Sequence, residues 1–205
     1  IKFRHFVEED ECTSDMGTNA AQLAILDSGL KPCDIDLIIV ATTTPDNTFP
    51  STAAKIQNNL SCKAISFDVQ AVCAGFVYAI SVGVAMLKDG HGKNCLVIGS
   101  DSMSKILDWN DRSTAVLFGD GAGAVILENR TVRNEFIEND QWGVLTNKIF
   151  TNGEYYDLLS TDGGVSKTKS TGFLRMNGKE VFKHAVEKLT SSLLMCLEEC
   201  NMNID

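Results

Sequence analysis

The sequence predicts an α/β protein in which helices cover both faces of a largely parallel, buried central sheet. Short runs of β-prone residues alternate along the chain with longer segments of helical periodicity, which is the order of parallel β-α-β units. The runs, such as 37–41, show no polar alternation, as is typical of strands buried on both faces. With 205 residues the chain suits one large or two small domains. We place the boundary where the pattern loosens, giving units 1–150 and 151–205.

The clearest elements lie before residue 100. Ser14 or Asp15 can cap a helix that runs to Ser28 and is closed by Gly29. The other elements expected in this part are strands at 37–41, 64–69 and 95–99 and helices at 51–60 and 74–88.

Beyond residue 110 the pattern predicts a strand at 114–118, a tight turn at 119–121 and a second strand at 122–127. The glycines of this turn also fit a dinucleotide-binding pattern. The β-prone run that follows them argues against that motif, which needs a helix there. The remaining elements expected are loops at 128–140 and 162–171, a strand at 142–150 and a long amphipathic helix at 176–200.

Composition narrows the class of protein. Lys and Arg number 18 against 27 Asp and Glu, a net charge of −9, which argues against a nucleic-acid binder. The longest apolar stretch, 73–87, falls short of the roughly 20 residues of a membrane span. No signal-peptide pattern opens the chain, so we expect a cytoplasmic protein with no membrane partner. The seven cysteines are odd in number and irregularly spaced, and they indicate neither a disulfide framework nor a metal site.

Residues 66–76 carry the strongest chemical signal. A strand gives way to a helix at about Cys73, so the thiol lies at a helix N-terminus, which favours a thiolate nucleophile. The N–H groups of that helix end could stabilise an oxyanion, and Ala71, Ala74 and Gly75 leave the backbone accessible. This is the thiol counterpart of a strand-turn-helix nucleophile elbow. By spacing alone, the alternative of a small buried core residue is favoured.

Other candidates are weaker. No His is near Cys73 in sequence, and His184 on the long predicted helix is expected to be structural. Arg112, in the polar segment 108–112, could form a surface salt bridge or clamp a phosphate or nucleotide.

Ordered landmarks along nearly the whole chain carry a family resemblance. They are VATTTP at 40–45, FPS at 49–51, FDVQAVCAGF at 67–76, GSD at 99–101, DR at 111–112, FGDGAGA at 118–124 and MNGKEVF at 176–182. In these segments the chain resembles the condensing enzymes of the thiolase superfamily, most closely the β-ketoacyl-acyl-carrier-protein synthase III family. The resemblance reverses the reading of Cys73, which becomes the expected catalytic nucleophile.

The resemblance implies an acyltransferase that performs the initiating condensation of fatty-acid synthesis. Cys73 would accept the acyl group of a short acyl-CoA, typically acetyl-CoA. Malonyl-acyl-carrier protein would then lose CO₂, and the resulting carbanion would attack the acyl-cysteine in a decarboxylative Claisen condensation. Acyl-CoA is here a substrate, and neither a cofactor nor a metal is implied.

The resemblance also assigns binding roles. Arg112 matches the CoA entrance, and Gly178 matches the passage of the pantetheine arm. Phe49 matches a residue that reaches into the partner subunit's pocket, which implies a homodimer, and Lys183 matches a docking position for the acidic carrier protein. The residues that match the acyl pocket are Met103, Phe118, Leu159, Leu174 and Met176.

The implied fold is the thiolase-like layered αβαβα fold. Residues 1–150 would form its first duplicated half, with the catalytic cysteine, and residues 151–205 the beginning of the second. No His or Asn of these 205 residues matches the family's other two catalytic residues. We therefore expect the chain to lack the opening strand and most of the C-terminal half, and to support self-acylation of Cys73 at most.

Two alternatives stay open. One is another condensing enzyme of the superfamily with a different acceptor, of the alkylquinolone, polyketide or hydroxymethylglutaryl type. The other is a non-catalytic fragment that binds acyl-CoA or carrier protein, or that forms a structural half of a dimer.

Overall fold

The computed structural model describes residues 2–130 and 143–204. The chain divides into two compact units, each described by itself below. Unit 1 comprises Ile1–Ser104 with Gly119–Ile137, and unit 2 comprises Lys105–Phe118 with Glu138–Asp205. The boundary predicted at residue 150 stays a prediction.

Unit 1 is built on a four-stranded sheet in the order β2-β1-β3-β4. Its strands are β1 (Leu37–Ala41), β2 (Ile65–Val69), β3 (Asn94–Ser102) and β4 (Asp120–Glu128). The first three are parallel and β4 runs antiparallel to β3, so the predicted, largely parallel sheet is confirmed. All five residues of β1 are buried, which explains their continuous apolar pattern.

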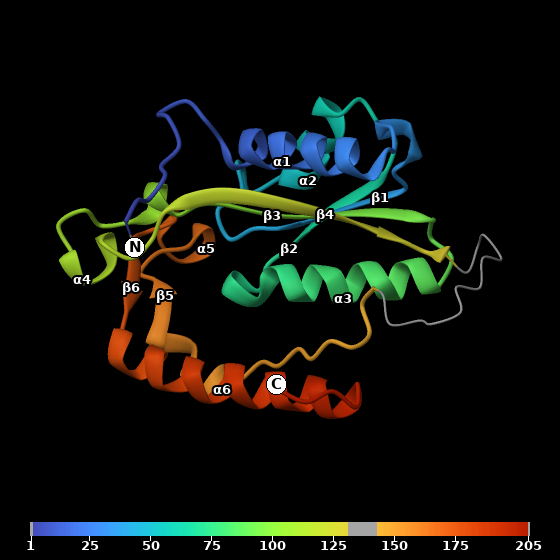
Figure 1. Ribbon diagram of the computed structural model, residues 1–205. Helices are drawn as coiled ribbons and strands as arrows, with labels where there is room; N and C mark the ends of the chain where they lie inside the picture. The colour runs from blue at the N-terminus through green and yellow to red at the C-terminus, as the bar shows by residue number, and fades with distance from the viewer. Residues whose placement is uncertain (1, 131–142, 205) are drawn as a thin grey trace. The chain divides into compact units, whose positions relative to one another are not determined.

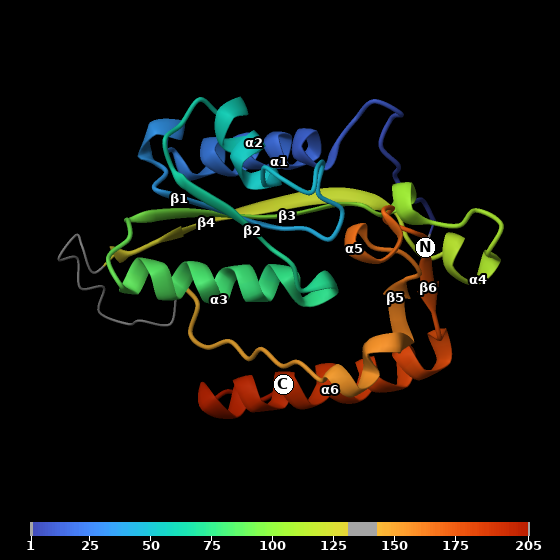
Figure 2. The same cartoon turned by 180° about the vertical axis from the view of Figure 1, so that it is seen from behind.

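Helices cover both faces of this sheet. α1 (Thr13–Ser28) and α2 (Thr52–Asn59) lie on one face and α3 (Gly75–Lys88) on the other (Figures 1 and 2). Because successive side chains of a strand point to opposite faces, β1 supplies two cores. Ile38 and Val40 pack on the side of α1 and α2, whereas Leu37 and Ile39 pack on the side of α3.

The helix ends follow local capping rules. The N-cap of α1 is Cys12, two positions before Ser14, the first predicted cap, and its N–H donates to the Asp15 carboxylate at 2.8 Å. Gly29 closes α1 at a φ of 70°, as predicted. The Ser51 hydroxyl caps α2 by accepting from the N–H of Ala54 at 3.2 Å.

The strand predicted at 114–118 and the turn predicted at 119–121 are wrong, whereas the strand predicted at 122–127 is confirmed as part of β4. Residues 112–115 form the short helix α4 (Arg112–Ala115), capped by the Asp111 carboxylate, which accepts from the N–H of Ser113 at 2.9 Å. The expected turn at 119–121 instead leads into β4, which begins at Asp120 and pairs with β3. A Cβ on Gly119 would lie 3.2 Å from the carbonyl oxygen of His5, so this glycine makes room for a neighbouring segment of chain.

Unit 2 contains a two-stranded antiparallel sheet of β5 (Leu159–Thr161) and β6 (Leu174–Met176). The short helix α5 (Val165–Thr168) lies within the segment expected as a loop, and the long helix α6 (Gly178–Glu199) confirms the predicted helix. Residues 143–150 are not in a strand, contrary to expectation. Trp142 and residues 131–140 of the loop predicted at 128–140 lie outside the described residues.

Short 3₁₀ segments complete the described elements. They are η1 (Pro32–Asp34), η2 (Val72–Ala74), η3 (Met103–Ile106) and η5 (Gly153–Leu158). Within the described residues, no helix has both the length and the apolar character needed to cross a membrane.

Candidate active site

Cys73 lies in the 3₁₀ turn η2, between the end of β2 and the start of α3. Its side chain is exposed, so the alternative of a buried core residue is wrong. The preceding residue, Val72, has a φ of 48°, a left-handed conformation that is strained for a β-branched side chain. All seven cysteines are free, but Cys95 is buried in β3, and burial raises the pKa of its thiol to about 12.

Two close contacts seat the Cys73 turn on the sheet. A Cβ on Gly75 would lie 3.3 Å from the Cβ of Ala41 at the end of β1. A Cβ on Gly99 in β3 would lie 3.2 Å from the ring of Phe76. The first turn of α3 therefore approaches the backbone of two parallel strands, and the two glycines make this approach possible.

A polar cluster lies at the same, carboxyl edge of the sheet. Oδ1 of Asp101 accepts from the N–H of Thr43 at 2.7 Å and from the hydroxyls of Thr42 and Thr44, each at 3.2 Å. Gln70, three residues before Cys73, donates from Nε2 to the Thr43 hydroxyl at 3.4 Å. Burial raises the pKa of Asp101 above its usual range, although the bonds from the threonines oppose that shift.

The sequence reasoning noted 40–45 and 99–101 only as landmarks and missed the Asp101 cluster. The usable signal was a set of hydroxyl side chains directly after one buried strand and a carboxylate near the end of its neighbour. Because the carboxyl ends of parallel strands share one edge, such residues meet, and ligands of open α/β sheets bind at this edge.

Asp68 of β2 orders the neighbouring segment. Its two carboxylate oxygens accept from the N–H groups of Thr52 at 2.8 Å and Ala53 at 2.7 Å, at the N-terminus of α2. A carboxylate at a helix N-terminus typically stabilises the folded state by about 0.3–1 kcal/mol.

Phe49, just before α2, is 83% exposed. Met103, the other predicted pocket residue of unit 1, is half-buried at the start of η3.

The other predicted binding residues lie in unit 2. Leu159 and Met176 are directly paired across β5 and β6, so the structure brings together these two residues of the predicted pocket. Leu174 is buried, at 4% exposure, and Gly178 is the first residue of α6. The remaining three are half-buried Phe118, exposed Arg112 at the start of α4, and exposed Lys183 on α6.

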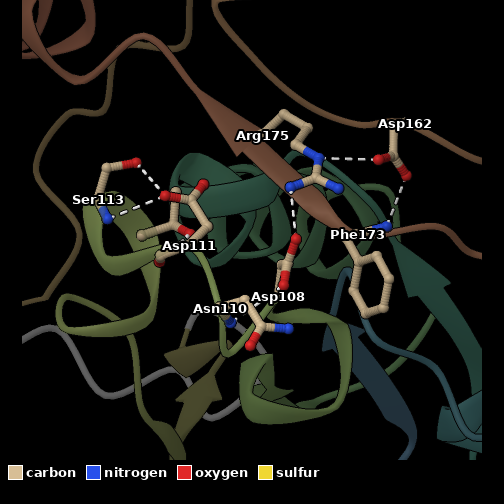
Figure 3. A network of polar contacts seen from close by, with 8 residues as sticks. Asp108, Asn110, Asp111, Ser113, Asp162, Phe173 and Arg175 are labelled. Carbon is tan, nitrogen blue, oxygen red and sulfur yellow. Dashed lines mark hydrogen bonds and ion pairs between the residues drawn. The ribbon is translucent and has the colours of Figure 1, made fainter.

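Arg175 of β6 is the centre of a polar network that the sequence reasoning missed (Figure 3). Its Nη1 donates to Oδ2 of Asp108 at 2.8 Å and its Nε donates to Oδ2 of Asp162 at 2.8 Å. The bond from Arg175 holds the pKa of Asp108 below its usual range. The pKa of Asp162 is lowered first by the N–H of Phe173 and then by Arg175. Asp108 belonged to the polar segment already noted, but nothing in the sequence pairs it with Arg175.

His184 lies on α6, and its ring stacks on Tyr155 with centroids 4.0 Å apart. This contact agrees with the structural role expected for that side chain.

The comparisons with known proteins point to one family. The family model described as 3-oxoacyl-[acyl-carrier-protein] synthase III matches residues 67–153. A β-ketoacyl-[acyl-carrier-protein] synthase III of Ehrlichia canis is 49% identical over 205 residues, which is 100% of this chain and 62% of the relative. The solved 3-oxoacyl-[acyl-carrier-protein] synthase III of Aquifex aeolicus is 38% identical, with a TM-score of 0.86 over 98% of this chain and 60% of that one. The corresponding structure from Thermus thermophilus is 33% identical, with a TM-score of 0.86 over 98% of this chain and 61% of that one.

These findings confirm the resemblance and the thiolase-like α/β fold. The chain spans 62% of the length of the first curated relatives it matches.

Proposed function

We propose that the chain is the nucleophile-bearing part of a β-ketoacyl-acyl-carrier-protein synthase III, an acyltransferase that initiates fatty-acid synthesis. One observation carries the proposal. Cys73 is exposed, follows a strained residue and lies in the η2 turn directly before α3, on a chain that is 49–50% identical over its length to relatives of that name. The names of these relatives favour this reading over a condensing enzyme with another acceptor.

The first step is transfer of an acyl group from a short acyl-CoA, with acetyl-CoA as the expected donor. The Cys73 sulfur attacks the thioester carbonyl, and the new S–C bond replaces the S–C bond to CoA, whose thiolate leaves with the electron pair. Backbone N–H groups at the start of α3 would donate to the oxyanion of the tetrahedral intermediate. The exposed position of Cys73 leaves room for this approach.

The second step joins the acyl group to malonyl-acyl-carrier protein. Loss of CO₂ leaves a carbanion that attacks the acyl carbonyl, and the Cys73 sulfur leaves as β-ketoacyl-carrier protein forms. The family's catalytic His and Asn have no match among these 205 residues. We therefore assign acylation to this chain and condensation to the protein at the length of its relatives.

The same proposal gives the binding residues their roles. Arg112 would contact CoA at the entrance, Gly178 would pass the pantetheine arm, and exposed Lys183 would meet the acidic carrier protein. The pairing of Leu159 with Met176 supports a shared place in the acyl pocket. The residues proposed to line that pocket are Met103, Phe118, Leu159, Leu174 and Met176.

Assembly and location follow from the same family reading. Phe49 is exposed and β2 is an edge strand, and both features support a homodimer in which Phe49 reaches the partner subunit. Acyl-CoA and carrier protein are expected substrates in the cytoplasm, and acyl-CoA is consumed rather than kept as a cofactor.

Intact-protein mass spectrometry after mixing with acetyl-CoA tests the proposal. We expect a mass gain of one acetyl group that disappears in Cys73→Ala. The 205-residue chain and a version extended to the length of the relatives are compared side by side. If neither gains an acetyl group, the proposed function is wrong. If only the extended version gains one, the acylation site needs residues beyond this chain.

A further inference from the structure

The segment that carries Arg112 is bonded to the β5–β6 sheet through Arg175. This segment, residues 105–118, exposes Trp109 at its surface and includes only the four-residue helix α4 beyond the end of η3. A short helix has little stability of its own, so its position depends on contacts with its surroundings.

The bonds at the Asp162 end fix the guanidinium of Arg175. Oδ1 of Asp162 accepts from the N–H of Phe173 at 2.7 Å, and the N–H of Asp162 donates to the carbonyl of Phe173 at 3.0 Å. Gly163 and Gly172, the neighbours of Asp162 and Phe173, lie close together, since a Cβ on Gly163 would lie 2.5 Å from the backbone nitrogen of Gly172. Asp162 therefore holds the Nε side of Arg175 from a tightly closed loop.

The bonds at the Asp108 end lead to Arg112. Oδ1 of Asp108 accepts from the N–H of Asn110 at 3.1 Å, and its carbonyl accepts from the N–H of Asp111 at 2.9 Å. Oδ1 of Asp111 then accepts from the N–H and hydroxyl of Ser113 at 2.9 and 2.6 Å, which caps the helix that begins with Arg112. These hydrogen bonds join β6 to the Asp111 cap of α4, whose first residue is Arg112 (Figure 3).

The charge of Arg175 is itself already matched. Two carboxylates contact one guanidinium, so Arg175 is poorly suited to bind a phosphate directly. Its Nη1 and Nε bind different carboxylates, a geometry that the planar guanidinium provides and a lysine ammonium does not reproduce. A positioning role fits these contacts better than a binding role.

We propose that Arg175 is a positioning residue for acyl-CoA. By bonding both Asp108 and Asp162, Arg175 fixes the 108–111 turn. The fixed turn positions the Arg112 guanidinium to bind the nucleotide phosphates. The inference rests on the proposed function, because it takes Arg112 as a CoA-binding residue.

The test compares two acetyl donors on the full-length protein. Acetyl-CoA contains the nucleotide, whereas the acetyl thioester of N-acetylcysteamine lacks it, and acylation of Cys73 is timed by mass spectrometry. Arg175→Gln should raise the KM for acetyl-CoA by up to about 100-fold, the scale of loss from a misplaced group, with little change in kcat. Acylation by the short thioester should stay unchanged. Arg175→Lys should restore only part of the loss.

Arg112→Gln gives the reference phenotype. If Arg175 acts through Arg112, the double variant should be no worse than Arg112→Gln alone. Glu199→Gln, which breaks the ion pair with Lys148 elsewhere in unit 2, is the matched control and should affect neither donor. Asp108→Asn weakens only one arm of the network, so it serves if Arg175→Gln fails to fold.

The outcomes separate the two proposals. If the wild-type protein is acylated by neither donor, the proposed function is wrong and this inference fails with it. If the wild type is acylated but Arg175→Gln and Asp108→Asn leave the KM for acetyl-CoA unchanged, only the positioning role is wrong. Equal losses with both donors, or losses that add to those of Arg112→Gln, would also overturn it.

Discussion

Single side chains define the carboxyl edge of the sheet in unit 1. Oδ1 of Asp101 accepts hydrogen bonds from three threonines. One of these threonines, Thr43, also accepts a hydrogen bond from Gln70 in the segment that leads to Cys73. Asp101 is half-buried, and a network of several hydrogen bonds to one of its oxygens favours one arrangement of the backbone. Asp101 therefore supports the framework around the nucleophile without being assigned a step in the reaction.

The Asp101 cluster gives a prediction for stability. Asp101→Ala leaves the N–H of Thr43 without its acceptor and should lower the free energy of unfolding by about 1–3 kcal/mol. Asp101→Asn keeps an oxygen in place of Oδ1 and should cost less. Urea unfolding of the wild type and both variants measures the difference. Equal losses in the two variants would contradict the role of Oδ1.

The raised pKa of Asp101 predicts how the stability of the wild type, compared with Asp101→Asn, depends on pH. The folded protein binds this proton more tightly than the unfolded chain, so folding is favoured below the unfolded pKa of about 3.9. That advantage is lost as the pH rises through the raised folded pKa. The stability of the wild type relative to Asp101→Asn should therefore fall as the pH rises through this window. A relative stability that rises instead would show that the pKa is lowered.

Secondary-structure elements show what the sequence could and could not predict. β1 and α2 were predictable because a continuous apolar run and a capping serine are local signals. Residues 114–118 were mispredicted as a strand because the cap at Asp111 overrides the β preference of the residues that follow. Gly119 was misread as part of a turn. A glycine is needed there because the backbone of His5 packs against it, and His5 lies more than a hundred residues away in the sequence.

Burial within β1 and β2 predicts unequal costs for the same substitution. Ile39 is fully buried in a central strand, so Ile39→Ala should lower the free energy of unfolding by about 2–5 kcal/mol. Ile65 begins the edge strand β2 and is 51% exposed, so Ile65→Ala should cost less than about 1 kcal/mol. Chemical denaturation of both variants measures the two values. A similar loss at both positions would place Ile65 in a second core or an interface.

At the scale of the whole molecule, the predicted site is divided between two units. The local strand-turn-helix pattern marked Cys73 as a candidate nucleophile, but only the family resemblance favoured it over a core residue. The proposed pocket residues rest on the resemblance alone. The Arg175 network was not predictable, because its members at 108, 162 and 175 meet only through tertiary structure. Ion pairs between segments so far apart leave no periodic signal in the sequence.

The proposed homodimer leads to a prediction about assembly. Phe49 is 83% exposed in a unit whose edge strand β2 is unpaired within the described sheet, and such features together indicate an interface. Phe49→Asp should convert a dimer into a monomer, because a carboxylate cannot be buried in an apolar partner pocket without large cost. Leu26→Asp, at a similarly exposed apolar side chain on α1, is the matched control and should leave the mass unchanged. Sedimentation velocity at micromolar concentration distinguishes the states. A wild-type monomer, or a Phe49→Asp dimer, would show that Phe49 does not hold two copies together.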